Sequence, residues 1–585
     1  MPAGLPDEFA SVFVEQVRIR NFRGLVELTV DLEPDVTLLV GRNNAGKSRV
    51  LRALALALGA DPAQLDDLTV TNSGTAEIDV VLAPTRPSPG TDEDAFDVAV
   101  ARRLVDVQTL REEPLQERFA WRTTVARSAE GLGARADARL LTYDLQAGRW
   151  ALSGNASQLS RDQRSVISAH LVPTSRDLVD ELTRRGSAVR RVLSDLEVPT
   201  AERQEIEAEL KDLGQRIVSG STTLNAVTEA LEQLEKTVGS LGRPALNPLP
   251  VRLEELARSV AIDLDAGTGA LPIRLHGSGA RSLASFQIQS VLYDRRLGAD
   301  GSAIRPQPVT LVEEPEAHLH PQATFELAEL LQATRGQVVA STHSAHLVTT
   351  VSPRAIRLLR LAGTKSVVVD LRPVDDPTPA TPRARRPELH VAEMEKLKRL
   401  VERPFGELLF ASAVVLGDGA TERAFLPPIL RHALGVRGHS VCVIDPGSMA
   451  NDLAFAAVKF AKLVGLPWLL FSDSDVSGRR DAEKLVASLG DGDGSLIVYG
   501  GASSGGTMRG ATEAMLVDFD EDLCRAACRT IRPELTEGGD VFEALKAAKG
   551  SAGASLAQTL VARYPTVSEW PGPLRQLVER LEARL

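Results

Sequence analysis

The chain is poor in cysteine and has no long apolar run. Its three cysteines among 585 residues are Cys442, which stands apart, and the closely spaced Cys524 and Cys528. No second Cys or His pair lies near that spaced pair, so helix packing is a better prediction for it than a zinc site. So few cysteines fit a reducing compartment. Because no apolar run reaches about 18 residues, a transmembrane helix is not expected.

A surplus of positive charge is missing as well. The formal net charge is −11, which argues against a protein held to nucleic acid by overall positive charge alone. DNA stays open as a partner, because a nuclease concentrates carboxylates around its metals. The first residues, MPAGLPDEFASVFVEQ, lack the basic and apolar regions of a signal peptide. We therefore expect a cytoplasmic protein with no membrane partner, long enough for two or three domains.

What the sequence does contain is a phosphate-binding loop in its required context. The apolar stretch VTLLV (36–40) runs into GRNNAGKS, and the helical stretch RVLRALALALGA follows. In this pattern, main-chain N–H groups and a helix N-terminus surround the phosphates of a nucleotide. Lys47 would reach the β- and γ-phosphates, and Ser48 would ligate Mg²⁺. The predicted nucleotide contacts in the loop are Gly41, Asn43, Asn44, Gly46, Lys47 and Ser48.

Two later strands end in candidate catalytic residues. The stretch PVTLVEEPEAHLHP (308–321) is an apolar strand that ends in Glu313 and Glu314. Strand alternation would point Glu313 toward Mg²⁺ and Glu314 toward the attacking water, although EEPE alone could also be a solvated helix start. The stretch QVVASTHS places His343 at another strand end, where it would sense the γ-phosphate. A lone histidine is more often structural, but this position beside the glutamate strand favours a catalytic role.

These segments resemble the ABC-type ATPase heads of the SMC-like and RecF-like group. The opening VEQVRIRNFRGLVELTVDLEP is similar to that group's first strands, with Arg23 in the position of its nucleotide-contacting arginine. LHGSGARSLASFQIQS resembles a degenerate signature loop, in which Ser278 and Gly279 would contact the nucleotide held by a second subunit. The resemblance therefore implies that two heads dimerise around ATP.

The middle of the chain is predicted to carry a helical insert and then a linker. Apolar residues recur at helical spacing from 206 to 241, interrupted at Gly214 and at SGSTT (219–223). A short antiparallel hairpin fits this better than a long coiled coil, and it is either a dimerisation insert, which we prefer, or a core-packed subdomain. A stretch rich in Pro, Thr and Arg follows the ATPase motifs. We predict an ATPase domain over 1–185 and 255–375, the insert over 186–254, the linker over 376–404 and a second domain over 405–585.

The second domain carries carboxylates at two predicted strand ends. AVVLGDGATE places Asp418 and Glu422 after one strand, and LLFSDSDVSG places Asp473 and Asp475 after another. Alternating strands and helices predict a parallel sheet whose carboxyl ends meet at one edge, so these oxygens can bind hard divalent cations. Each pattern alone is common, and Asp-Gly is an ordinary turn dipeptide. Together they resemble the Toprim fold of topoisomerases, primases and some nucleases, which hold Mg²⁺ with such residues.

The layout of the whole chain resembles the OLD (overcoming lysogenization defect) nucleases, in which an ABC-type ATPase with a short insert precedes a Toprim domain. The resemblance implies DNA cleavage with two divalent cations. It also implies that Asp418 and Asp473 are catalytic. The implied metal ligands of the second domain are Asp418, Glu422, Asp473, Asp475 and Glu513.

At three of the positions that the resemblance implies, alternatives stay open. Glu513 could equally be a first-turn helix acid. Lys549 would stabilise charge near the scissile phosphate, with Lys546 as an alternative and a solvated helical lysine as the ordinary role. The family usually has a glutamate where Asp418 stands, so a weakened nuclease is a further alternative.

We therefore predict an α/β protein, in which an ABC-type ATPase head with a helical insert precedes a Rossmann-like Toprim domain with a parallel sheet. The expected activity is ATP-regulated DNA cleavage in phage defence or DNA repair. ATP with Mg²⁺ and, at the Toprim site, Mg²⁺ or Mn²⁺ with Ca²⁺ as a further candidate are the expected cofactors. A homodimer or a higher oligomer is expected, and the sequence leaves open whether a helicase is a partner. The alternatives are an ATP-dependent DNA-binding or signalling module with an inactive Toprim domain, and a recombination-type structural ATPase.

Overall fold

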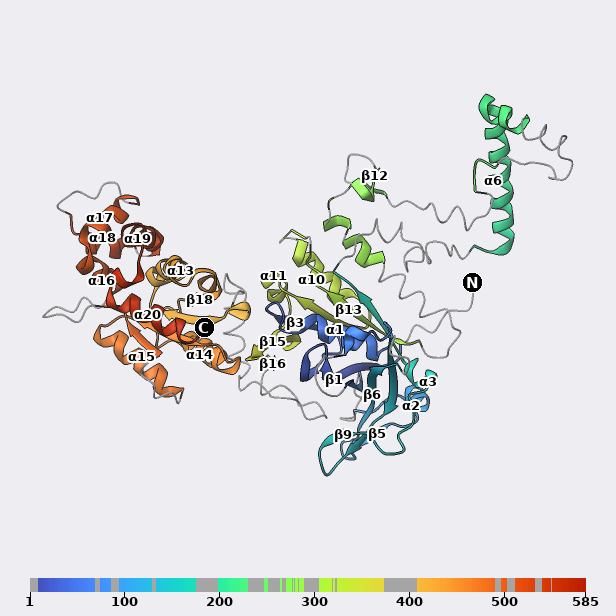
Figure 1. The fold of residues 1–585 in the computed structure, drawn as a ribbon, viewed down its shortest axis with the longest axis horizontal. Coiled ribbons are helices and arrows are strands. Elements are labelled where there is room, and N and C mark those ends of the chain that lie inside the picture. Colours follow the sequence, from blue (N-terminus) through green and yellow to red (C-terminus); the bar gives the residue numbers. More distant parts are fainter. Residues whose placement is uncertain are drawn as a thin grey trace. The chain divides into compact units, whose positions relative to one another are not determined.

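The fold is described from a computed structural model (Figure 1). The structure describes residues 9–68, 74–85, 94–128, 133–174, 198–229, 247–250, 263–265, 270–275, 277, 279–281, 283–288, 305–317, 319–320, 323–372, 408–489, 496–501, 511–531, 539–548 and 550–585. Helices and parallel strands alternate in it, so the predicted α/β class is confirmed. None of the described helices is long and apolar enough to cross a membrane. The predicted linker, 376–404, lies outside these residues.

The described residues fall into two compact units. The smaller unit contains those within 172–303 and 317–323, and the larger unit contains the remainder. In the smaller unit, helix α6 (Thr200–Gly220) runs through Gly214, so the predicted interruption there is wrong, whereas the break at Ser221 is confirmed. One glycine costs a helix only about 1 kcal/mol, and this one is buried beside Pro248. A second helical stretch covers 222–229, and its predicted continuation to 241 lies outside the described residues.

The larger unit begins with an antiparallel sheet in the order β2-β1-β4-β6-β5, with β7 paired to β6. Its central strands alternate little and are buried along most of their length, because both faces are covered. The strands are β1 (Val12–Phe22), β2 (Leu25–Asp31), β4 (Thr75–Pro84), β5 (Gln108–Arg111), β6 (Gln116–Arg127) and β7 (Ala134–Leu140).

A second sheet, in the order β10-β13-β14-β3-β15-β16, carries the nucleotide motifs. Strands β13, β14, β3 and β15 are parallel, so their carboxyl ends share one edge. Helix α1 (Lys47–Ala57) contacts strands of both sheets (Figure 1), which explains why its sequence is apolar on nearly every side. The strands are β3 (Val36–Gly41), β10 (Ile167–Val172), β13 (Gln307–Glu313), β14 (Gln337–Thr342), β15 (Ile356–Ala362) and β16 (Lys365–Asp370).

A buried amide, the side chain of Gln337 at the start of β14, links the two sheets. Its Oε1 accepts from the main-chain N–H of Val14 at 2.9 Å. Its Nε2 donates to the carbonyls of Val14 and Glu33, each at 2.8 Å. One side chain therefore satisfies main-chain groups of β1 as a neighbouring strand would.

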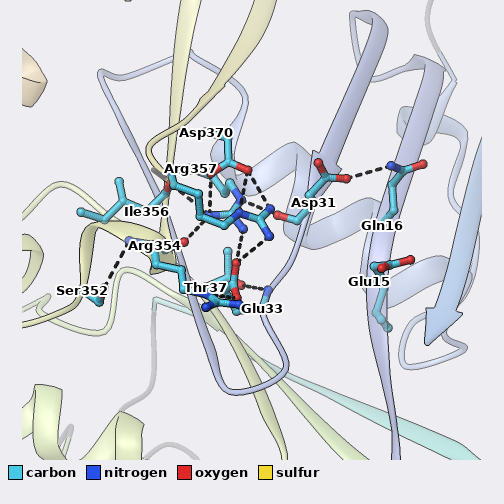
Figure 2. Close-up of polar contacts among 12 residues, drawn as sticks. Glu15, Gln16, Asp31, Glu33, Thr37, Ser352, Arg354, Ile356, Arg357 and Asp370 are labelled. Atoms are coloured by element: carbon cyan, nitrogen blue, oxygen red, sulfur yellow. Dashed lines mark hydrogen bonds and ion pairs between the residues drawn. The ribbon is translucent and has the colours of Figure 1, made fainter. Parts of the chain in front are cut away.

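An ion-pair network, buried except for Arg354, lies at this same end of the second sheet, around Glu33 (Figure 2). Glu33 receives hydrogen bonds from Arg357 at 2.7 Å and Arg354 at 3.0 Å, and Arg372 lies 3.0 Å away. Asp370 pairs with Arg372 at 2.7 Å. Burial raises the pKa of Glu33, but the arginines outweigh it and hold that pKa below its usual value. The network therefore stays ionised, and each charge in it depends on a partner.

The C-terminal part of the larger unit contains a four-stranded parallel sheet in the order β18-β17-β19-β20. The strands are β17 (Ala413–Gly417), β18 (Val441–Ile444), β19 (Trp468–Ser472) and β20 (Ile497–Tyr499). The helices are α13 (Ala420–Leu434), α14 (Asp452–Leu463), α15 (Val476–Ser488), α16 (Thr512–Phe519), α17 (Glu521–Arg529), α18 (Val541–Ala548), α19 (Gly550–Arg563) and α20 (Gly572–Glu582).

Helices α17, α18 and α19 lie together (Figure 1) and share one apolar core with α13 and α20. Cys524 and Cys528 are fully buried in that core as free thiols. Burial raises the pKa of Cys524 to about 12. The prediction that this pair packs a helix is therefore confirmed.

Candidate functional site

The P-loop between β3 and α1 has the backbone that a phosphate cradle needs. Asn44 has φ 64° and Gly46 has φ 112°, both in the left-handed region. Gly41 lies so close to β15 that a Cβ there would be 2.2 Å from the Leu359 carbonyl oxygen. The glycines of the motif are therefore required by the backbone. Asn43 and Ser48 are exposed at the loop surface, where a ligand can reach them.

Lys47 is buried at the first position of α1 and points back over the loop. Its Nζ donates to the Gly41 carbonyl at 2.8 Å and to the Arg42 carbonyl at 3.2 Å, and it lies 2.8 Å from His343 Nε2. Burial lowers the pKa of Lys47 to about 8, although Glu314 and Glu316 oppose the shift. A bound polyphosphate would supply the negative charge that this ammonium lacks.

His343 comes directly after β14, the strand between β13 and β3. The sheet order therefore brings its ring between the P-loop lysine and the glutamate segment after β13. Its Nε2 lies 3.4 Å from Glu314 Oε1. Burial and then the charge of Lys47 lower the pKa of His343, so the ring is neutral near pH 7 and accepts a hydrogen bond from Lys47.

Glu313 is the last residue of β13, and Glu314 lies just beyond it. Glu314 has φ 44°, a left-handed conformation that is uncommon outside glycine. Its N–H donates to the Ser341 carbonyl at 3.0 Å, which stabilises this turn. The backbone therefore turns at Glu314, so simple strand alternation does not set the direction of its side chain.

Arg23 lies in the turn between β1 and β2, where its φ is 46°. Its Nε donates to Asp67 Oδ1 at 2.8 Å, and the buried Asp67 also pairs with Arg52 of α1 at 2.9 Å. The arginines outweigh burial and lower the pKa of Asp67. Asp67 could not be predicted from the sequence, because the segment LDD (65–67) matches no motif.

The predicted signature loop would contact a nucleotide through Ser278 and Gly279. Ser278 lies outside the described residues, and Gly279 belongs to the smaller unit. Their proposed contact with a nucleotide therefore stays a prediction.

The second candidate site lies at the carboxyl ends of β17 and β19, which are neighbours. Asp418 follows β17, and its Oδ2 accepts from Ser472 Oγ at 2.9 Å and from the Asp473 main-chain N–H at 3.0 Å. The short aspartate side chain is thus held against the end of β19. A glutamate at this position would carry its carboxylate one methylene further out.

Glu422 and Asp473 are the two strongly perturbed carboxyls of this site. Burial raises the pKa of Glu422 to about 7, with further contributions from Glu513 and Asp418. Burial raises the pKa of Asp473 to about 8, and Glu422, Asp418, Glu513 and Asp475 add to the shift. The five carboxyls therefore lie close enough to repel one another, as at sites that hold a hard cation.

Asp475 and Glu513 each have a local structural partner. Asp475 caps α15, accepting from the Gly478 N–H at 2.6 Å through Oδ1. Glu513 lies in the first turn of α16, and its Oε1 accepts from Thr421 Oγ1 at 2.6 Å. Asp475 is thus a helix cap and Glu513 is a first-turn helix acid. The second oxygen of each carboxylate takes no part in these hydrogen bonds.

Two glycines let the acidic residues approach one another. A Cβ at Gly417 would lie 2.5 Å from Glu422 Cβ. A Cβ at Gly478 would lie 3.2 Å from Asp418 Oδ2 and 2.6 Å from the Asp473 carbonyl oxygen. The close packing of the site therefore depends on the absence of these side chains.

Lys549 lies outside the described residues, and its alternative, Lys546, lies on α18 with its Nζ 5.9 Å from the centre of the Phe542 ring. Within the part of the chain that the structure describes, no group of three or more His, Cys, Asp or Glu forms a preformed metal cage. The acidic site is therefore a cluster of neighbouring carboxyls.

Two family models and several known proteins are similar to this chain. Residues 13–85 match the family model "AAA ATPase domain", and residues 162–349 match "AAA domain, putative AbiEii toxin, Type IV TA system". The chain is 24% identical over 485 residues to the "OLD nuclease" of Thermus scotoductus, covering 79% of this chain and 82% of that protein. It is 21% identical over 493 residues to the "Old nuclease" of Escherichia phage P2, covering 80% and 78%.

Solved SMC head domains are also similar. One, a head bound to the C-terminal winged-helix domain of ScpA, is 16% identical and covers 61% of this chain and 97% of its own, with a TM-score of 0.32. Another, with an extended coiled coil and a ScpA domain derived from Pyrococcus furiosus, is 15% identical and covers 61% and 96%, with a TM-score of 0.35. The ATPase assignment depends on the family models and on the P-loop geometry.

Proposed function

We propose that this chain, a relative of the OLD nucleases as its motifs predicted, is an ATP-hydrolysing, divalent-metal-dependent DNA endonuclease. The observation that carries the nuclease half is the cluster of carboxyls at the ends of β17 and β19. Burial and then the neighbouring acids, Asp418 among them, raise the pKa values of Glu422 and Asp473 there. Carboxyls with pKa values near 7 to 8 gain most from a divalent cation, since the cation offsets both burial and mutual repulsion.

The residues that would hold divalent cations at this site are Asp418, Glu422, Asp473, Asp475 and Glu513. Bound cations would activate a water and stabilise the leaving oxygen of the scissile phosphate. The chain's own contribution is positional. Ser472 and the N–H of Asp473 fix Asp418, and Thr421 orients Glu513. Lys549 stays the proposed cation beside the phosphate.

The ATPase half of the proposal is supported by the neighbouring carboxyl ends of β3, β13 and β14. Lys47 would contact the β- and γ-phosphates, Ser48 and Glu313 would hold Mg²⁺, and Glu314 would orient the water. Neutral His343, within reach of both Lys47 and Glu314, would respond to the γ-phosphate. Arg23, fixed by Asp67, would contact the nucleotide from the β1–β2 turn.

Dimerisation through the insert and around ATP, a cytoplasmic location and a role in phage defence or DNA repair are part of the same proposal. Helix α6 supports the first of these, because its apolar Leu213 and Ile217 are exposed. The location follows from the two substrates, ATP and DNA.

Plasmid cleavage tests the nuclease. Purified protein is incubated with supercoiled DNA and Mg²⁺, Mn²⁺ or Ca²⁺, with and without ATP. We expect nicking or linearisation that Asp473→Ala and Glu422→Gln abolish, while Asp518→Asn, an exposed change on α16, leaves it intact. Absence of cleavage with every metal, despite ATP hydrolysis and DNA binding, would contradict the nuclease and favour an ATP-dependent DNA-binding module.

A further inference from the structure

Glu316 connects the two strand ends that carry the candidate ATPase residues. It lies two residues after Glu314, in the segment that leaves β13. Its Oε1 accepts three hydrogen bonds, from Thr342 Oγ1 at 2.7 Å, the His343 N–H at 2.7 Å and the Ser344 N–H at 3.1 Å. One carboxylate oxygen thus binds three consecutive residues at the end of the neighbouring strand β14.

This contact occurs beyond the ladder of β14, where the His343 N–H needs an acceptor outside the sheet. The Ser344 N–H is shared between Glu316 and Thr342 Oγ1, the latter at 2.9 Å. Beyond Thr342 the ladder of β14 ends, and Ser344 caps the short helix α11 (Ala345–Thr349). The N–H groups of His343 and Ser344 have no carbonyl partner in a strand at this point. A charged acceptor is roughly twice as strong as a neutral one for such donors. Glu316 therefore fixes the backbone from which the His343 ring projects.

The same segment is fixed on its other side. The Glu314 N–H donates to the Ser341 carbonyl at 3.0 Å. Glu314 and Glu316 therefore bond to β14 on both sides of Pro315, and this holds Glu314 in its left-handed conformation, φ 44°. A strained backbone of this kind persists only where its surroundings over-determine it.

The two groups that these hydrogen bonds position, the His343 ring and the Glu314 side chain, lie close together. The His343 ring lies 2.8 Å from Lys47 Nζ and 3.4 Å from Glu314 Oε1. A shift of the 342–344 backbone would move the ring away from both groups. Misplacement by about 1 Å costs an enzyme roughly 100-fold in rate.

We propose that Glu316 is a positioning residue for ATP hydrolysis, which holds His343 and the Glu314 turn in register with Lys47. This inference rests on the proposed ATPase function. Glu316 acts through the loop that it binds, and nucleotide affinity depends mainly on the P-loop. Loss of Glu316 should therefore lower kcat and leave KM for ATP nearly unchanged.

The test is steady-state ATP hydrolysis by the full-length chain. We expect Glu316→Ala to lower kcat by about 10- to 100-fold, with KM changed less than about 3-fold. Glu316→Gln retains an acceptor oxygen of the same reach and should restore most of the rate. Glu329→Ala, an exposed glutamate on α10 (Ala323–Ala333), is the matched control and should behave as wild type.

A double-mutant cycle decides whether Glu316 acts through His343. In a His343→Ala background, Glu316→Ala should lower kcat little further, because the ring it positions is gone. Thr342→Val, which removes one of the three donors at nearly constant volume, should give a smaller loss of kcat and keeps the test valid if Glu316→Ala fails to fold.

The outcomes separate the two claims. If wild type hydrolyses ATP and Lys47→Ala does not, the ATPase proposal stands. If Glu316→Ala then retains the wild-type kcat, or loses ATP binding and kcat together while Gln gives no rescue, the positioning role is overturned. If the wild-type chain hydrolyses no ATP, both claims fall.

Discussion

The acidic site makes a prediction that runs against the usual effect of changing a buried charged residue. In metal-free protein, Asp473→Asn should raise stability at alkaline pH. Its carboxyl is largely withdrawn from water and faces four other acids, so ionisation is unfavourable in the folded state. The variant retains the main-chain N–H of residue 473 that Asp418 binds. It removes only the charge that the neighbours repel.

The magnitude follows from the shift in pKa. The folded value is about 8 against 3.8 for the free side chain, and each unit is 1.36 kcal/mol, which sets an upper bound of about 6 kcal/mol. Part of the repulsion is shared with Glu422, and partial exposure to water screens the rest. We therefore expect Asp473→Asn to raise the free energy of unfolding at alkaline pH by about 1–3 kcal/mol. Between pH 4 and 8 the folded state holds a proton that the unfolded chain releases, so wild-type stability falls as pH rises. The advantage of asparagine should therefore grow over that range and level off above pH 8.

Scanning calorimetry of the full chain in EDTA at pH 5.5 and 8.5 measures this. We expect Asp473→Asn to melt several degrees above wild type at pH 8.5 and closer to it at pH 5.5. Asp518→Asn, exposed on α16, should shift neither. Adding Mg²⁺ at pH 8.5 should stabilise wild type more than the variant. A variant less stable than wild type at pH 8.5, or equally shifted at both pH values, would refute the proposed repulsion.

Three further changes test other parts of the structure. Gln337→Ala should lower the free energy of unfolding by about 3–5 kcal/mol in urea titration, because it leaves three buried main-chain groups unpaired; exposed Gln332→Ala should change it little, and an equal effect would contradict this role. Gly417→Ala should displace Glu422 and reduce cleavage by roughly 10- to 100-fold without altering ATP hydrolysis. Lys47→Ala should abolish ATP binding, measured by calorimetric titration, while the Mg²⁺-dependent melting shift persists; loss of both would argue against independent sites.

The sequence motifs locate the candidate residues well because their chemistry depends on local spacing. Gly41 and Gly46 are required by the backbone of the loop itself, and the P-loop pattern contains both. Strand ends were also predictable, since Asp418 and Asp473 each follow a short apolar run. What the motifs could not supply was the order of strands. Strand β14 lies between β13 and β3, and its pairing with β3 joins residues about 300 positions apart. This order places His343 beside Lys47.

The sequence also could not show that one side chain can serve two roles. The D-x-D pattern predicts a metal ligand at Asp475, yet the same residue three positions before Gly478 is an ordinary helix cap. Both roles suit one carboxylate, so spacing alone cannot choose. Asp67 and Glu316 were missed because their partners are distant in sequence or are main-chain groups. Gly214 does not end its helix because the cost of a glycine there is small and packing beside Pro248, distant in sequence, can offset it.

The hydrogen bonds from Gln337 to the main chain of Val14 determine which residues the fold tolerates at these two positions. Gln337 bonds to the main chain of residue 14 and to none of its side-chain atoms. In a saturation library selected for folded protein, position 14 should accept several apolar residues of high strand propensity. Position 337 should accept glutamine almost alone, since asparagine is one methylene too short to reach all three groups. A chimaera that replaces the antiparallel sheet would thus need an unpaired main-chain amide at this register, and also a main-chain carbonyl where Arg357 now bonds to that of Asp31.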